Sequence, residues 1–268
     1  MEINWELVYE KLVGSDDPFL FNHEEVAEVV FKVYKRFAEK DFQNGRIEGI
    51  ETYYKFDRDG YETSGIIDLW GRDAAGDLFI SDWKTTGSFT DSWIFRESAS
   101  DQSLQYVHGL FSLGFVEASF PVKVHIRGIT RSGSIKSLPV RIVQAEDLAK
   151  FDLQQAQWAA LYAESKSGGW NNSWAQNKPD GCTQFGYNYL CPFSGNGCGD
   201  HIGGIDQLKE PRLSHSFLKN YKRCPEYARL LTIKRQFDTI EEESDELMWG
   251  LAFHRGIAEV YRQMKEGI

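Results

Sequence analysis

The sequence predicts an α/β domain in which helices flank a central mixed β-sheet, followed by an irregular lobe that contains cysteines. Three observations support this: apolar residues recur at helical spacing, β-rich runs with short turns lie between those segments, and the composition changes at residue 166. The chain has 268 residues, of which 41% are hydrophobic and 26% are charged. That length is sufficient for a large core, and the composition is that of a globular protein rather than a disordered or fibrous one.

The first predicted elements are a helix and a β-meander. Residues 22–40 alternate apolar and charged positions at helical spacing, so we expect an amphipathic helix there. Residues 50–56 and 61–72 are β-rich runs on either side of an Asp-Gly turn, which is typical of a hairpin. A second turn leads into a third run at residues 78–84, so three consecutive strands are expected.

The middle of the chain predicts four more elements: a helix, two strands and a long helix. They are expected at residues 103–115, 122–131, 138–144 and 145–165. Together with the meander they form the core domain, predicted to span residues 1–165.

Residues 166–213 contain nine of the 24 glycines and three of the four cysteines, with almost no periodicity. A structureless segment of this length in a compact domain needs something other than a core to hold it. Past it, residues 214–231 and 245–265 are predicted to be helices, and we assign residues 214–268 to the same domain as the core.

The charge balance and the absence of targeting signals narrow the class of protein. No apolar run approaches the roughly 20 residues that cross a bilayer, and the first residues lack the order of a secretion signal. We therefore expect an intracellular, cytoplasmic protein with no membrane partner. A formal net charge of −10 argues against a protein that coats nucleic acid with its whole surface, although a local basic groove is compatible with it.

Two carboxylates and a lysine are predicted to converge on the meander. Asp68 lies near the end of one strand, and Asp82 and Lys84 lie two residues apart on the next, so the last two leave the same face. Adjacent buried carboxylates repel each other unless one is protonated or a cation lies between them, and an oxygen-lined Mg²⁺ or Mn²⁺ site solves that problem. The alternative is a pair of solvated carboxylates at strand ends.

At this point the chain resembles a known family. Gly65-Ile66-Ile67-Asp68 followed by Ile80-Ser81-Asp82-Trp83-Lys84 is similar to the signature of PD-(D/E)XK nucleases of the RecB-like branch. Glu51 on the preceding strand and the Gln102-x-x-x-Tyr106 pattern add to the resemblance. It implies a restriction-endonuclease-like core with these catalytic residues: Asp68, Asp82, Lys84, Glu51, Gln102 and Tyr106.

The motifs that normally open such nucleases resemble segments at the end of this chain, namely residues 213–225 and Gly250-Leu-Ala-Phe-His254. We therefore expect a circularly permuted order, which requires chain ends that lie close together. The resemblance implies that His254 is a metal ligand beside Asp68, Asp82 and the carbonyl of Trp83. The alternative is that residues 213–268 begin a second, truncated nuclease unit, which would leave His254 away from this site.

The cysteines are similar to those of iron-sulfur members of the same branch. The resemblance implies that a [4Fe-4S] cluster is held by Cys182, Cys191, Cys198 and Cys224, and zinc is the alternative. Independently of the family, a four-thiolate clip would tie the irregular segment to the following helix. Buried free thiols are the plainer alternative.

Basic residues around Cys224, namely Lys219, Lys222 and Arg223, are candidates for phosphate contacts, or else form an ordinary solvated face. The expected function is divalent-metal-dependent DNA hydrolysis, as an exonuclease on single strands or duplex ends in phage, repair or recombination processing. Two alternatives stay open. One is a non-cleaving nucleic-acid-binding subunit that uses the nuclease-like fold as a scaffold, and the other is a metalloprotein with a redox cluster.

Overall fold

The computed structural model describes residues 3–13, 23–38, 45–58, 61–114, 120–167 and 245–267. They fall into two compact units. The first unit contains the described parts of residues 1–54, 66–148 and 242–268. The second contains those of residues 55–65 and 149–241, including most of the long helix α6 (Ala145–Ser167). The site lies within the first unit.

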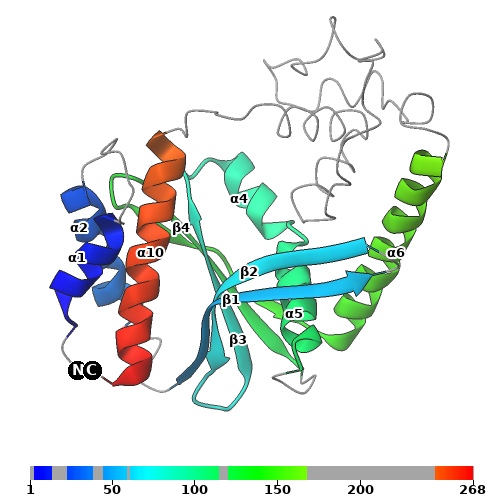
Figure 1. Ribbon diagram of the computed structural model, residues 1–268, viewed down its shortest axis with the longest axis horizontal. Helices are drawn as coiled ribbons and strands as arrows, with labels where there is room; N and C mark the ends of the chain where they lie inside the picture. Colours follow the sequence, from blue (N-terminus) through cyan, green and yellow to red (C-terminus); the bar gives the residue numbers. More distant parts are fainter. Residues whose placement is uncertain are drawn as a thin grey trace, which may run out of the picture. The chain divides into compact units, whose positions relative to one another are not determined.

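A mixed sheet forms the centre of the first unit, except for residues 55–58 and 61–65 of its first two strands, which belong to the second unit (Figure 1). Its strands are β1 (Arg46–Arg58), β2 (Tyr61–Arg72), β3 (Leu78–Thr85), β4 (Val122–Ile129), β5 (Ile135–Ser137) and β6 (Arg141–Val143). The order is β1-β2-β3-β4-β5, with β6 also paired to β4. β2 and β3 are antiparallel, whereas β3 and β4 are parallel. The chain makes the parallel connection through two helices, α4 (Asp91–Ser98) and α5 (Gln102–Ser112).

Three helices cover one face of this sheet. They are α1 (Trp5–Val13), α2 (His23–Val33), which continues into the π-helical turn η1 (Tyr34–Ala38), and α10 (Asp245–Glu266). Their apolar side chains share one buried cluster with Phe79 and Trp83 of β3. The missing side chain of Gly256 lets α10 approach α1, since a Cβ there would lie 2.5 Å from Leu12 Cδ2.

The opposite face of the sheet belongs to α4 and α5. Ile80, Asp82 and Lys84 alternate with the cluster residues of β3, so they point to this second face. Gly128 of β4 leaves room for the Trp93 ring of α4, which would otherwise lie 2.4 Å from a Cβ. The strand β3 therefore presents an apolar side to α10 and a charged side to α5.

The prediction of a central mixed sheet flanked by helices is confirmed, with differences in detail. The expected helix at residues 22–40 appears as α2 and η1, and the expected final helix as α10. Helices α1 and α4 were not predicted. Each is only about two or three turns long, and α4 is marked by its cap, in which the Trp93 amide donates to the hydroxyl of Thr90 at 3.2 Å. The expected strand at residues 138–144 is shorter, as β6.

The first and last described segments lie next to each other (Figure 1). The Asn4 amide donates to Gln263 Oε1 at 2.7 Å, and Gln263 Nε2 donates to the Asn4 carbonyl at 3.2 Å. The predicted irregular segment at residues 166–213 and the predicted helix at residues 214–231 lie outside the described residues. In the part of the chain that the structure describes, no helix combines the length and the apolar character that a bilayer span requires.

Candidate active site

The antiparallel pairing of β2 and β3 brings Asp68 and Asp82 together. Leu69 lies opposite Ser81, so continuing that register by one residue sets Asp68 opposite Asp82. Here the carboxylate of Asp68 takes the place of a main-chain acceptor, because the Trp83 amide donates to Asp68 Oδ2 at 2.9 Å. Asp82 is buried at 3% exposure, and the Asp68 side chain is 19% exposed. The two carboxylates thus meet at the edge of the core.

Lys84 lies two residues beyond Asp82 and pairs with its carboxylate. Lys84 Nζ is 2.8 Å from Asp82 Oδ2 and 3.0 Å from Oδ1. It also donates to Gln102 Oε1 at 2.8 Å. The ammonium group therefore has acceptors from both the sheet and helix α5.

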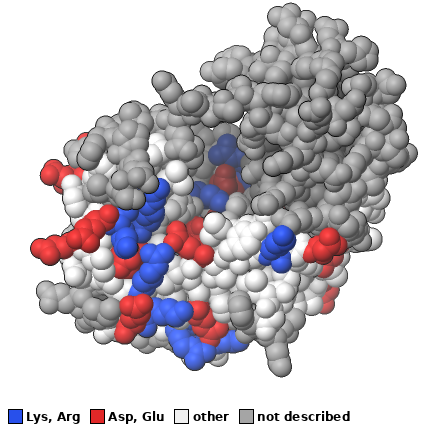
Figure 2. All heavy atoms as spheres, viewed as in Figure 1, with Lys and Arg blue, Asp and Glu red and all other residues white. Residues whose placement is uncertain are grey.

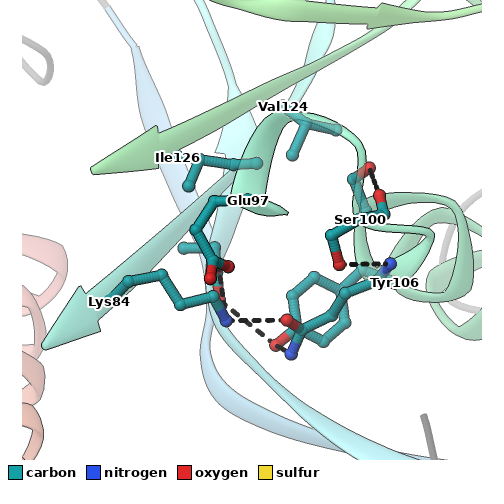
Figure 3. Close-up of a pocket in the computed structure, with 9 residues that line it drawn as sticks. Lys84, Glu97, Ser100, Tyr106, Val124 and Ile126 are labelled. Atoms are coloured by element: carbon teal, nitrogen blue, oxygen red, sulfur yellow. Dashed lines mark hydrogen bonds and ion pairs between the residues drawn. The ribbon is translucent and has the colours of Figure 1, made fainter. Parts of the chain in front are cut away.

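Gln102 and Tyr106 close a ring of hydrogen bonds around this pair (Figure 3). They are one turn apart on α5, and Gln102 Nε2 donates to the Tyr106 hydroxyl at 2.6 Å. That hydroxyl in turn donates to Asp82 Oδ1 at 3.2 Å. The ring Lys84–Gln102–Tyr106–Asp82 links the two motif residues of β3 to the two motif residues of α5. It restrains the side chain of Lys84.

Burial and neighbouring charges set the protonation of this group. Burial favours the neutral form of Lys84, but Asp82, Asp68 and Glu97 outweigh it and raise the pKa of Lys84 above its ordinary 10.5. Burial and the charge of Asp82 raise the pKa of Tyr106 well above 10.0. At neutral pH Lys84 is therefore an ammonium group, and Tyr106 keeps its proton and donates it.

For Asp68 the effect of burial on the pKa outweighs that of the neighbouring positive charges, whereas for Lys84 the neighbouring charges outweigh burial. Burial raises the pKa of Asp68 to about 6, while His254 lowers it, Asp82 raises it and Lys84 lowers it. The ionised form of Asp68 is thus held at a cost to the folded protein. A cation beside the carboxylate would offset that cost.

His254 lies beside Asp68, although the two are 186 positions apart in the sequence. His254 Nδ1 is 3.6 Å from Asp68 Oδ2, and 30% of the histidine side chain is exposed. Gly250, one turn earlier on α10, lies close to Thr85 of β3, since a Cβ there would be 3.0 Å from the Thr85 hydroxyl. If residues 213–268 began a second, truncated nuclease unit, the imidazole of His254 would be expected away from Asp68.

The donor set suits a small divalent cation in part. Ligands of one Mg²⁺ or Mn²⁺ lie about 2.0–2.2 Å from the ion, so the 3.6 Å between Asp68 and His254 is compatible with a shared ion. Asp82 is turned toward Lys84. Among the described residues no group of three or more His, Cys, Asp or Glu side chains is gathered as a metal site. Mg²⁺ is commonly held by one or two carboxylates plus water and substrate phosphate, so this partial set still fits.

Glu51 has a partner on α10 rather than in the hydrogen-bonded ring. Its carboxylate pairs with Arg262, which also pairs with Glu259 at 3.2 Å. The backbone of Glu51 has φ +44°, a left-handed conformation that is uncommon for a non-glycine residue within a strand. Figure 2 shows acidic and basic side chains interleaved in this region, where α10 runs beside the start of β1. The catalytic role of Glu51 stays a prediction.

Glu97 of α4 was missed in the sequence, and it points into the site (Figure 3). It is 9% exposed and pairs with Arg96 Nε at 2.8 Å. With Lys84, Asp82 and Tyr106 it lines a small pocket that has room for about one water molecule. A single acid between two motifs offers no spacing signal, so only the packing of α4 could have identified it.

Several predicted site residues stay untested. For Trp83 the structure shows the amide and the indole engaged, and the ligand role of its carbonyl stays a prediction. The four predicted cluster cysteines and the predicted phosphate contacts Lys219, Lys222 and Arg223 lie outside the described residues. Comparison with protein-family models finds no match to this chain, and comparison with curated proteins finds no relative.

Proposed function

We propose that the protein is a divalent-metal-dependent nuclease that hydrolyses phosphodiester bonds in DNA. One observation supports this most strongly: residues far apart in the sequence supply facing carboxylates, a restrained ammonium group and an imidazole at one partly buried place. Phosphodiester hydrolysis needs such groups, because negative charge must be neutralised while a water is aligned with the phosphorus atom.

Asp68, Asp82 and His254, together with the Trp83 carbonyl, would hold Mg²⁺ or Mn²⁺. A bound ion of this kind supplies Lewis-acid stabilisation of the charge that develops on the phosphate. Asp82 would have to direct one oxygen away from Lys84 for this purpose. Its three donor contacts, two from Lys84 and one from Tyr106, show how the carboxylate is oriented before substrate arrives.

Lys84 acts in this proposal as a charged donor and not as a base. Its raised pKa keeps it protonated at neutral pH, so it can donate to a phosphate oxygen or orient the attacking water. Gln102 accepts a hydrogen bond from the ammonium group and is itself held by the Tyr106 hydroxyl, so the ammonium group stays beside the carboxylate of Asp82. Restricting a long side chain before binding lowers the entropy lost in the reacting complex.

We also propose that the chain is a circularly permuted PD-(D/E)XK nuclease of the RecB-like branch with a restriction-endonuclease-like core. The contacts of Gln102 and Tyr106 with Lys84 and Asp82 support this proposal, as does the proximity of residues 4 and 263. The expected substrate is single-stranded DNA or duplex ends in phage, repair or recombination processing, and the expected location is the cytoplasm. The [4Fe-4S] cluster, or zinc, belongs to the proposal as well, and the iron and zinc content of the purified protein tests it.

The deciding experiment compares the wild type with Lys84→Ala on labelled linear and circular DNA in the presence of Mn²⁺. We expect the wild type to degrade linear DNA, and Lys84→Ala to lose at least about 100-fold of that activity. Lys123→Ala is the matched control, because Lys123 of β4 also pairs with two aspartates, which lie at the turn before β3 and away from the site. If Lys84→Ala and the wild type degrade DNA equally, the assignment of the site is wrong.

A non-cleaving DNA-binding subunit is the second candidate. Two observations favour it. Both carboxylate oxygens of Asp82 contact Lys84, and among the described residues no three His, Cys, Asp or Glu side chains are gathered to hold a metal ion. In that case Asp68→Ala would leave DNA binding and the biological output unchanged, and the wild type would degrade neither linear nor circular DNA.

A further inference from the structure

One buried hydrogen bond joins helix α10, which carries His254, to strand β3, which carries the acidic residue and lysine of the site. Trp83 Nε1 donates to the hydroxyl of Tyr261 at 3.1 Å. Both side chains are only 1% exposed. Because water does not reach this pair, a turn or slide of α10 would deprive the buried indole N–H of Trp83 of this acceptor.

Trp83 is linked to both members of the Asp68–His254 pair, directly to Asp68 and through Phe253 to His254. Its main-chain amide donates to Asp68 Oδ2 at 2.9 Å. Its ring meets the ring of Phe253 edge to face, with centroids 5.7 Å apart, and Phe253 is the neighbour of His254. A displaced Trp83 would therefore move Asp68 through the main chain and His254 through the helix.

Tyr261 lies seven residues after His254, which is about two helical turns or about 10 Å along α10 and almost the same face. α10 also packs against the sheet through apolar side chains, since Phe253 and Ile257 share one buried cluster with Phe79 and Trp83 of β3. Apolar contacts resist separation but tolerate sliding, since they have no preferred direction. The hydrogen bond of Tyr261 is directional, so it can determine the rotation and register of the helix.

We propose that Tyr261 is a positioning residue whose hydroxyl, through Trp83, sets α10 in the register that brings His254 to Asp68. The inference rests on the proposed function, in which these two side chains hold the divalent ion. Tyr261 itself touches no reacting atom. The simpler alternative is that the hydroxyl only satisfies the indole N–H and stabilises the fold.

The test replaces Tyr261 by phenylalanine, which removes the hydroxyl and keeps the ring. Gln263→Met is the matched control: Gln263 is also 1% exposed on α10, but its hydrogen bonds lead to Asn4 and Glu259 and not to β3. Circular dichroism first establishes a temperature at which all proteins are folded. Mn²⁺ binding is then followed by the electron paramagnetic resonance signal of the free ion.

We expect Tyr261→Phe to bind Mn²⁺ about tenfold more weakly, as is common when a residue that orients a metal ligand is lost, and Gln263→Met to stay within twofold of the wild type. The double variant Trp83→Phe/Tyr261→Phe should bind Mn²⁺ no more weakly than the weaker-binding single variant, because both substitutions remove the same hydrogen bond. Unchanged binding in Tyr261→Phe, or an equal loss in Gln263→Met, would overturn the proposal.

A second measurement needs neither metal nor DNA. The imidazole nitrogen shifts of His254 are followed by nuclear magnetic resonance in the metal-free protein, and a His254→Gln variant identifies its signal among the six histidines. We expect them to change in Tyr261→Phe and not in Gln263→Met, and unchanged shifts would refute the positioning role. A wild type that neither binds Mn²⁺ nor degrades DNA would end the proposed function, whereas the His254 shifts would still decide the role of Tyr261.

Discussion

Replacing Asp68 by asparagine is expected to stabilise the fold while it abolishes the metal-dependent activity. Asparagine has nearly the shape of aspartate, and its side-chain oxygen can still accept the Trp83 amide. It carries no charge, so the burial of an ionised carboxylate opposite Asp82 no longer opposes folding. The variant therefore separates what the fold prefers from what the chemistry needs.

The size of the effect follows from the pKa of Asp68, which burial raises from 3.8 to about 6. At neutral pH this difference corresponds to at most about 3 kcal/mol of lost stability. Since 19% of the side chain stays exposed to water, we expect a gain of about 2 kcal/mol for Asp68→Asn at pH 8.

The sign of the pH dependence follows from proton binding. Between about pH 4 and pH 6 the folded protein binds more protons at Asp68 than the unfolded chain does, so wild-type stability falls as the pH rises through this window. Asp68→Asn lacks this fall, and the difference between the two proteins should vanish below about pH 4.

Urea denaturation in metal-free buffer at pH 4, 6 and 8 measures these differences. Asp73→Asn is the control of opposite sign, because hydrogen bonding to Lys123 lowers the pKa of Asp73 and its ionised form stabilises the fold at neutral pH. The explanation is refuted if Asp68→Asn is less stable than the wild type at pH 8, or if the difference between them is independent of pH.

Three further predictions follow. Tyr106→Phe removes the donor to Asp82. We expect the free energy of unfolding, measured with urea, to fall by about 2 kcal/mol and the rate of DNA degradation to fall at least tenfold. Wild-type values in both assays would contradict the hydrogen-bonded ring. Gly256→Ala places a Cβ 2.5 Å from Leu12, so the free energy of unfolding should fall by about 1–3 kcal/mol and the melting temperature by several degrees. An unchanged melting temperature would argue against the close packing of α1 and α10. Mn²⁺ should raise the melting temperature of the wild type in a concentration-dependent way, and chelation should reverse this; an equal rise in Asp68→Asn would place the ion elsewhere.

Short-range patterns in the sequence predicted most of the elements correctly. Helical spacing identified α2 and α10, and the turns on either side of β2 identified the meander that carries Asp68 and Asp82. The two-residue spacing of Asp82 and Lys84 placed both on one face of β3, which the ion pair between them reflects. These features depend on neighbours within a few residues, so the periodicity of the chain contains the information.

Contacts between distant segments required the tertiary structure. The family resemblance implied that His254 lies beside Asp68, but the 3.6 Å approach itself depends on how α10 packs against the sheet, and no local spacing specifies that packing. For the same reason the sequence did not reveal Glu97 in the pocket, nor Arg262 as the partner of Glu51. Backbone geometry repeats every 2 or 3.6 residues, so the order of amino acids specifies which strands and helices form and which side chains share a strand face. Which of these faces meet is specified by the packed fold, because the apolar sides of all the elements must be buried at once.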